Sequence, residues 1–508
     1  ASMEDQTLVL AAPRTGKSGW LADRIIDHPG AVVTTTTRTD LLHNTAPLRA
    51  RRGPVHVFNP EGTGGVPSTF RWNPLAGCDQ PATALQRATS LTAATQTSGM
   101  QDMAFWIGKA AAVLACLLHA AALDHRPMTQ VYRWAHGIDD TAPEQILSRY
   151  PAASAWTGPL REIRKPGRTS DSIRMTVTRA LAWLADPAVA AATSPGPGDG
   201  FDVTEFASGA GTLYMIGTGR EEAPIAPLFR AFAEYVHAGA AYAGSLQPHG
   251  RLDPPMLMAL DEVTQICPVP LPLWMADSAG KGILIVAVCH GLAQLQARWD
   301  TPGAQAIWDT AGIKVILGGV TDTATLEDLS RLCGETALRT RTRTITEDGR
   351  RAYATSYQPA RVLPLELLRG LPEWRALIIR GNLSPVIVRL RMAWKRHDHR
   401  HARRTGLTPA QRRPLRAAGR PELPPPSPGP ADDTEPPADR EARYPSESQP
   451  RPAFSEDPGT PPNPPQPRPP ADDRIRRDAP PRTTRPGADG TPRPRRPWDP
   501  PANPGERP

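Results

Sequence analysis

Cysteine and aromatic residues are scarce in this chain. Its 508 residues include five cysteines, and aromatic side chains make up 6% of the total. No two cysteines form a Cys-x-x-Cys pair, which excludes a cysteine zinc site and a disulfide framework and indicates a reducing compartment. The five are Cys78, Cys116, Cys267, Cys289 and Cys333.

The chain also lacks a signal peptide and a convincing membrane span. Its best candidate, residues 110–122, is short and alanine-rich, with Lys109 at its edge and His119 inside it. We therefore expect a buried helix there. Because the chain begins without Met, directly before an apolar strand, we expect a fragment whose upstream part, possible membrane helices included, is absent.

Long apolar runs are missing from about Thr405 onward, where roughly half of the 60 prolines lie. Such a segment cannot bury enough surface to offset its chain entropy, so we expect residues 405–508 to be disordered. Its basic clusters, 474–477 and 493–496, fit a solubilising tail or a docking arm equally well. The net charge of +8 is modest, so nucleic-acid binding by the folded part would need a local basic patch.

Before this tail, short apolar segments alternate with helical stretches. This order predicts an α/β fold with a mostly parallel sheet and crossover helices. The strands are expected at 7–12, 31–34, 55–58, 212–216, 256–260, 283–288, 315–317, 376–379 and 386–388. We expect an α/β core in two parts, with an all-α domain inserted between them and a linker signal at 194–200. The predicted domains are residues 1–79, 80–200 and 201–400, followed by the tail at 405–508.

The segment Ala11-Ala-Pro-Arg-Thr-Gly-Lys-Ser18 has the pattern of a phosphate-binding loop between a strand and a helix. In such a loop, successive backbone N–H groups and a helix N-terminus surround phosphate oxygens. Lys17 would reach the β- and γ-phosphates, and the Ser18 hydroxyl would ligate Mg²⁺. The residues expected to bind the nucleotide are Ala12, Pro13, Arg14, Thr15, Gly16, Lys17 and Ser18.

A nucleotide site of this type needs carboxylates at the end of another buried strand. The segment Met256-Leu-Met-Ala-Leu-Asp-Glu262 supplies them. Asp261 would organise the Mg²⁺ shell, and Glu262 would orient and deprotonate the attacking water. The pair predicts a hydrolase, because a protein that only binds nucleotide has little need of Glu262.

Several further segments resemble the TraG/TraD-type coupling ATPases of bacterial conjugation and type IV secretion, and the likeness extends from about residue 7 to 394. The order and spacing of these motifs are more specific than any one of them. The matching stretches are Ala12–Ser18, Thr37–Leu41, Arg71-Trp-Asn-Pro-Leu75, Leu260–Glu262, His290–Leu295 and Gly318–Asp322.

The resemblance implies a RecA-like P-loop motor of the FtsK/HerA-related class with an inserted all-α domain. Such proteins assemble as homo-hexameric rings at the cytoplasmic face of the bacterial inner membrane. They use Mg²⁺ and ATP and are thought to pass single-stranded DNA, with its attached relaxase, to the type IV secretion channel. The inserted domain would meet the relaxosome proteins.

The chain departs from the family pattern at two positions. His290 stands where the family has a Gln that senses the γ-phosphate; an imidazole can do part of this work, and a strand-end histidine without a role remains an alternative. Lys281 is the nearest cation where the family often has an arginine finger. Arg298 is a second finger candidate, although an exposed helix arginine is its simpler interpretation.

Two basic segments are candidates for nucleic-acid contact, or else solvated surfaces. One is the run 389–404, in which Trp394 could stack a base. The other is Arg339-Thr-Arg-Thr-Arg343, an arginine-rich hairpin that could point charge into a ring pore.

The sequence therefore predicts an ATP-driven DNA coupling protein in which Lys17, Glu262 and His290 act in catalysis and Ser18 and Asp261 hold the metal. Three alternatives stay open. They are an FtsK-like translocase of double-stranded DNA, a secretion ATPase that moves protein, and a nucleotide-gated docking receptor with little hydrolysis.

Overall fold

The computed structural model describes residues 5–95, 103–196, 198–218, 224–345, 349 and 351–405. The predicted tail therefore lies, apart from Thr405, outside the described residues. All five cysteines are described, and each is buried with a free thiol.

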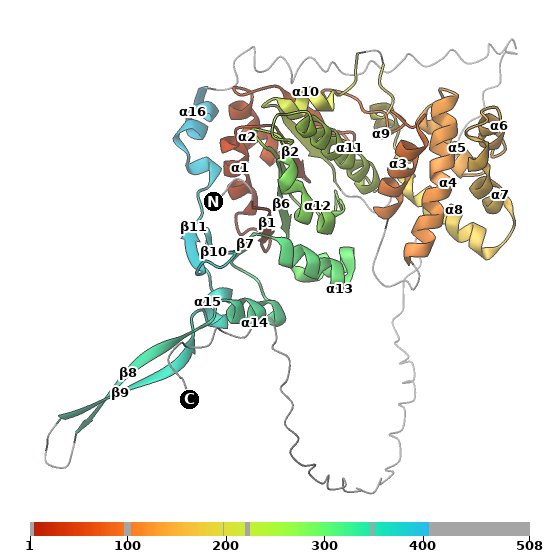
Figure 1. Cartoon of the computed structure of the whole chain (residues 1–508). Coiled ribbons are helices and arrows are strands. Elements are labelled where there is room, and N and C mark those ends of the chain that lie inside the picture. Colours follow the sequence, from red (N-terminus) through yellow and green to blue (C-terminus); the bar gives the residue numbers. More distant parts are fainter. Residues whose placement is uncertain are drawn as a thin grey trace, which may run out of the picture. The chain divides into compact units, whose positions relative to one another are not determined.

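A nine-stranded sheet forms the centre of the fold (Figure 1). Every pairing from β7 across to β3 is parallel, whereas β10 pairs antiparallel with both β7 and β11. The predicted α/β class with a mostly parallel sheet is confirmed. In spatial order the strands are β11 (Val386–Arg389), β10 (Arg375–Arg380), β7 (Ile313–Leu317), β1 (Thr7–Leu10), β6 (Ile283–Cys289), β5 (Met256–Leu260), β2 (Val32–Thr36), β4 (Thr212–Ile216) and β3 (Val55–Phe58).

The central strands are buried on both faces of the sheet and are mostly apolar, although β2 also buries Thr34, Thr35 and Thr36. In β1, Leu8 and Leu10 contribute to one core and Val9 to the other, and all three are fully buried. The helices α1 (Lys17–Asp27), α2 (Asp40–Arg49) and α16 (His397–Thr405) pack on the Val9 side. The opposite side is covered by α11 (Ala226–Ser245), α12 (Leu271–Asp277) and α13 (Leu292–Thr310).

A run of helices without a strand occupies the described residues between β3 and β4, as expected for an all-α segment. These helices are α3 (Pro81–Ala93), α4 (Met103–Leu123), α5 (Met128–Ala135), α6 (Ala142–Ser148), α7 (Gly158–Arg164), α8 (Arg168–Ala180), α9 (Pro187–Ala192) and α10 (Val203–Ser208).

Within the described ranges, one stretch of helix, Ala104–Leu123 in α4, is long and apolar enough to cross a membrane. Its most apolar 18-residue window is 67% buried among other helices, and Leu114 and Leu118 are fully buried. This burial is typical of a core helix and agrees with the sequence-based expectation.

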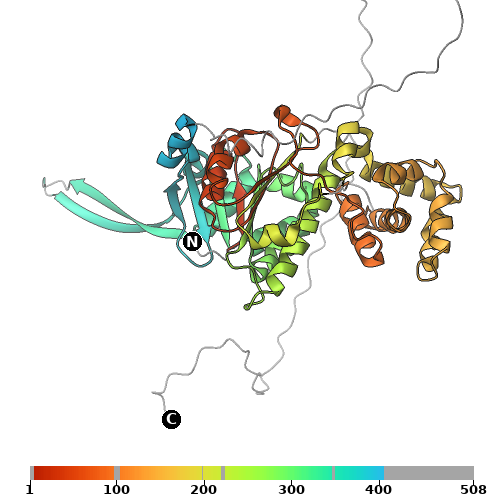
Figure 2. The same cartoon turned by 90° about the horizontal axis from the view of Figure 1, so that it is seen from above.

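A two-stranded antiparallel ribbon, β8 (Glu335–Ile345) and β9 (Arg351–Arg361), extends away from the sheet in both views (Figure 1, Figure 2). It leaves the core between α14 (Thr323–Leu332) and α15 (Leu365–Arg369). Short 3₁₀ turns complete the described elements at Thr63–Gly65, Ser154–Thr157, Ala182–Ala185, Ser278–Lys281 and Ala393–Lys395.

Candidate nucleotide site

The phosphate-binding pattern folds as a loop between β1 and α1. The Ala11 backbone N–H still donates to the carbonyl oxygen of Cys289 at 3.1 Å, after which the chain leaves the sheet. Arg14 and Gly16 adopt left-handed conformations, with φ of 65° and 97°, and the Thr15 hydroxyl donates to the Ala12 carbonyl oxygen at 2.8 Å. No side chain in the described part of the chain caps the start of α1, so its first backbone N–H groups are available to an anion.

The two predicted carboxylates stand directly opposite Lys17. Asp261 and Glu262 follow β5 and are 4% and 9% exposed. The Lys17 ammonium forms an ion pair with Glu262, and its Nζ lies 3.8 Å from Asp261 Oδ1. Glu262 has a φ of 51°, an uncommon backbone conformation for a non-glycine residue and one that is often found at functional sites.

The surroundings of Asp261 fit a divalent cation. Burial raises the pKa of its carboxyl to about 6, although Lys17 acts in the opposite direction. Among the described residues, no hydrogen-bond donor reaches its buried Oδ1. A buried carboxylate oxygen of this kind and the hydroxyl of Ser18, in the first turn of α1, are the hard oxygen ligands that Mg²⁺ prefers.

His290 joins the site from β6, the strand between β1 and β5. Its Nε2 lies 3.1 Å from Glu262 Oε2, and its Nδ1 lies 3.1 Å from the Ala11 carbonyl oxygen. The ring therefore bridges the phosphate loop and the carboxylate pair. Of these two contacts, the one to the Ala11 carbonyl oxygen is a hydrogen bond, whereas Glu262 Oε2 has no hydrogen-bond partner among the described residues.

Gln294 supports His290 and was not singled out from the sequence. Its Oε1 accepts a hydrogen bond from the His290 backbone N–H at 3.0 Å and one from the Thr264 hydroxyl at 3.4 Å. It thereby connects the loop after β6 to the loop after β5. The only sequence signal for it is its place in the segment His290–Leu295.

The side chains that cover the phosphate loop were also missed in the sequence. A Cβ built on Gly16 would lie 3.0 Å from Met392 Cε and 3.1 Å from Trp374 Cδ1, so these side chains cover the loop. The Lys395 ammonium lies 3.7 Å from the Trp374 ring centroid. These residues come from the far end of the chain, and no local pattern could have placed them there.

The two finger candidates lie outside this cluster. Lys281 pairs with Asp277 just before β6 begins, whereas His290 follows its last residue, so the length of a strand, roughly 20 Å, separates them. Arg298 is not an exposed helix arginine, and that interpretation was wrong. It is half-buried and donates to the Ala94 carbonyl oxygen at the end of α3, and burial lowers its pKa to about 10.

The basic run 389–404 folds back on α1. Arg391 and Arg396 form ion pairs with Asp23 and Asp27. Trp394 packs against Gly19, because a Cβ there would overlap its ring. Two of the arginines considered for nucleic-acid contact therefore hold the C-terminal segment against the first helix.

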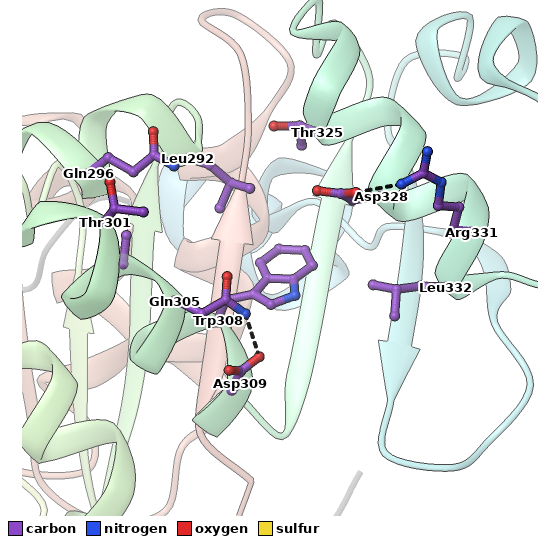
Figure 3. A pocket seen from close by; sticks show the side chains of 11 residues that line it. Leu292, Gln296, Thr301, Gln305, Trp308, Asp309, Thr325, Asp328, Arg331 and Leu332 are labelled. Atoms are coloured by element: carbon purple, nitrogen blue, oxygen red, sulfur yellow. Dashed lines mark hydrogen bonds and ion pairs between the residues drawn. The ribbon is translucent and has the colours of Figure 1, made fainter. Parts of the chain in front are cut away.

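A cavity of about 330 Å³ lies between α13 and α14. Figure 3 shows Trp308 facing the α14 side chains Asp328 and Leu332. Leu332 is 53% exposed, and Arg331 and Asp328 form an ion pair of 3.8 Å at the rim. The lining thus combines an apolar floor with charges of both signs.

Comparison with known proteins points to one family. Residues 255–373 match the family model described as "TraM recognition site of TraD and TraG". The fold is similar to that of the bacterial conjugative coupling protein TrwBdeltaN70 in its unbound monoclinic form. That structure is 19% identical, with a TM-score of 0.57, and the alignment covers 77% of this chain and 86% of that chain.

The plasmid coupling protein TrwB in complex with ADP and Mg²⁺ is also similar. It is 18% identical, with a TM-score of 0.55, over 76% of this chain and 85% of that chain. Among curated protein sequences none matches. At these identities the solved structures show the fold, an α/β arrangement with a RecA-type core. The matched segment and the shared fold together confirm the expected resemblance to TraG/TraD-type, TrwB-like conjugative coupling proteins.

Proposed function

We propose that this chain is an ATP-driven coupling protein of bacterial conjugation or type IV secretion, which brings single-stranded DNA and its relaxase to the secretion channel. The observation that carries the proposal is the convergence of Lys17, Glu262 and His290 at the ends of β1, β5 and β6. That arrangement suits hydrolysis of a phosphoanhydride bond. TrwB has been solved in complex with ADP and Mg²⁺, with the ATP analogue ADPNP and with the GTP analogue GDPNP, which supports a purine nucleotide at this site; ATP is the nucleotide that we propose.

In the proposed mechanism, the loop Ala12–Ser18 holds the phosphates through its backbone N–H groups and the start of α1. Lys17 turns from Glu262 to the β- and γ-phosphate oxygens, which offer it more negative charge. This movement releases the Glu262 carboxylate to accept a proton from the attacking water.

Ser18 and Asp261 would hold Mg²⁺, which supplies charge neutralisation between the phosphate oxygens when bound. His290 contacts both Glu262 and the loop, so it is placed to orient the carboxylate and to respond when the γ-phosphate leaves. A finger from a neighbouring subunit would complete the site in a homo-hexameric ring. We propose that the ring works at the cytoplasmic face of the inner membrane.

The sequence predicted a relaxosome contact on the inserted all-α domain. Because the TraM recognition model matches residues 255–373 instead, we propose the cavity between α13 and α14 as the contact for a relaxosome protein. All of its lining residues fall within 255–373, the segment that matches the TraM recognition model. Its floor is apolar around Trp308 and Leu332, and Asp328 lies at its rim. A partner segment with an apolar side chain beside a basic one would match this lining.

The decisive experiment is ATP hydrolysis with and without single-stranded DNA, for the wild type and for Lys17→Ala and Glu262→Gln. We expect turnover that rises with single-stranded DNA and is lost in both variants. ATP binding without turnover, at protein concentrations high enough for rings, would favour the nucleotide-gated receptor. Stimulation only by long duplexes would favour an FtsK-like translocase, and no stimulation by DNA would favour protein secretion.

A further inference from the structure

We infer that one face of the β8–β9 ribbon is a binding surface for single-stranded DNA. The inference deepens the proposed function, because it names a surface on which the proposed cargo would lie. It does not depend on ATP hydrolysis, and it can be tested without nucleotide.

The ribbon is solvated on both faces. Leu338, Tyr353 and Tyr357 are 56%, 51% and 67% exposed, and the other side chains described between 335–343 and 353–359 are exposed as well. A two-stranded ribbon that buries neither face is marginally stable in water by itself. A binding partner would supply the missing contacts.

The two faces of the ribbon differ in charge. Side chains alternate along a strand, so Arg339, Arg341 and Arg343 share one face. The register places Arg339 opposite Tyr357 and Arg343 opposite Tyr353 on the neighbouring strand. The other face carries uncharged side chains in its described part, namely Thr336, Leu338, Thr340 and Thr342 on β8 and Ala354, Ser356, Gln358 and Ala360 on β9.

The Arg–Tyr face is a continuous cationic and aromatic surface. The Arg341 guanidinium lies 4.1 Å from the Tyr353 ring centroid, so the ring and the cation are already in contact. Among the described ribbon residues the one carboxylate is Glu335, at the base, where it stands opposite Arg361 in the register. Glu347 and Asp348 lie in the sequence between the two strands, outside the described residues, so the proposed surface is confined to Arg339, Arg341, Arg343, Tyr353 and Tyr357.

The spacing of these groups favours a single strand as the occupant. Arginines two residues apart along β8 are separated by about 7 Å, which is comparable with the step between phosphates in an extended single strand. Tyr353 and Tyr357 offer rings on which unpaired bases can stack. Bases in a duplex are already stacked on each other and cannot use these rings.

The base of the ribbon is fixed to the motor core. The Ser330 hydroxyl of α14 donates to the Leu363 carbonyl oxygen at 2.7 Å, and the Val362 backbone N–H donates to the Gly334 carbonyl oxygen at 3.0 Å. The chain reaches α14 from β7 through Gly319, whose backbone lies beside Ala12 in the phosphate loop. A single DNA strand bound to the ribbon would thus be connected to the nucleotide site through α14 and the loop that contains Gly319.

The test is fluorescence anisotropy of a labelled 20-nucleotide oligo(dT), without ATP and over a range of salt concentrations. The triple variant Arg339→Ala, Arg341→Ala and Arg343→Ala should bind at least 10-fold more weakly. The slope of log K against log salt should also become shallower by about 2, since a single strand contributes about 0.7 per lost phosphate contact. The double variant Tyr353→Ala and Tyr357→Ala should weaken binding about 10-fold or more without changing the slope.

The matched control is Thr336→Ala, Thr340→Ala and Thr342→Ala on the opposite face, which should bind within 2-fold of the wild type. Circular dichroism and ATP turnover without DNA should be unchanged in all three variants, which separates this result from a failure of the proposed function. Wild-type affinity and slope in the arginine variant would overturn the inference. Equal weakening by the threonine variant, or equal affinity of the wild type for a duplex, would overturn it too.

Discussion

The imidazole of His290 and the carboxylate of Glu262 lie 3.1 Å apart, from Nε2 to Oε2. The same ring contacts the Ala11 carbonyl oxygen through Nδ1, so one side chain connects the phosphate loop to the proposed base. We take this relationship as the reason to test His290 first.

Replacing His290 with Ala should lower the rate of ATP hydrolysis by about 10²-fold, because Glu262 loses the group that orients it. His290→Gln should recover most of the rate, since an amide can still donate to the carboxylate from the same position. ATP affinity, measured separately by equilibrium binding, should change less than 3-fold in both variants. Equal rates in wild type and His290→Ala would leave His290 without a catalytic role.

The ion-pair cluster on α1 should contribute strongly to stability. Burial by itself would raise the pKa of the Asp23 carboxyl, but hydrogen bonds from Arg24, Arg396 and Arg391 lower it below the usual value. Because Asp23 is fully buried, Asp23→Asn removes the buried anion of the cluster. Arg391 and Arg396 keep Asp27 as a partner, so the change should cost about 2–3 kcal/mol in the free energy of unfolding. Urea denaturation measures this cost.

The control for this cluster is Arg391→Ala. The Arg391 side chain is 55% exposed, so its removal should cost no more than about 1 kcal/mol. If Asp23→Asn also lowers the free energy of unfolding by no more than about 1 kcal/mol, the segment 389–404 is held against α1 by apolar packing alone.

Much of the fold follows from local sequence. All nine strands of the sheet were expected close to their observed positions, because strands that are covered on both faces read as uninterrupted apolar runs. The convergence of Lys17, Asp261 and Glu262 also follows from their pattern, since carboxyl ends of parallel strands share one edge of the sheet.

Other features could not be predicted in this way. The amino-acid composition of β10 and β11 does not indicate that these two strands are antiparallel to their neighbours. Trp374 and Met392 reach Gly16 only through tertiary packing across more than half of the chain. The basic run 389–404 suggested solvated charge, but the anions that pair with Arg391 and Arg396 belong to α1 and are invisible from the run itself.

The cavity between α13 and α14 leads to a prediction about the binding of a partner protein. Trp308→Ala together with Asp328→Lys should weaken binding of the cognate relaxosome accessory protein at least 10-fold, because one change removes the apolar floor and the other reverses the rim charge. Surface plasmon resonance measures this affinity. ATP turnover should stay at the wild-type rate, and the exposed change Arg126→Ala on the helical segment is the control. Unaltered affinity would place the contact elsewhere in 255–373.

Two buried histidines should make the protein sensitive to mild acid. Burial lowers the pKa of His28 and of His237 to about 4 in each case, from about 6.5 in an unfolded chain. Because the unfolded state binds more protons between these values, stability is complete above about pH 6.5 and falls as the pH drops towards 4. The loss should reach about 3 kcal/mol for each histidine.

The contribution of His237 to this loss of stability in acid can be measured separately from that of His28. Its ring stacks on Trp274, with centroids 4.1 Å apart, and its Nε2 lies 2.8 Å from the Ser278 hydroxyl. In His237→Phe the fall in unfolding free energy between pH 6.5 and 4 should become shallower, whereas Trp274→Phe keeps the histidine and should keep the slope. Identical slopes in all three proteins would show that His237 does not titrate in this window.

The contact between Gly19 and Trp394 should show a strong coupling in stability. An alanine at an early helix position normally stabilises a helix by roughly 0.5–1 kcal/mol relative to glycine. Here the new Cβ would lie 2.0 Å from the Trp394 ring, so Gly19→Ala should instead destabilise the protein, by about 1–3 kcal/mol. Trp394→Ala removes the clash, and the double variant should therefore be more stable than the sum of the two single changes predicts, by at least 1 kcal/mol. Thermal denaturation of the four proteins completes the cycle, and simple additivity would mean that the C-terminal segment does not rest on α1 in solution.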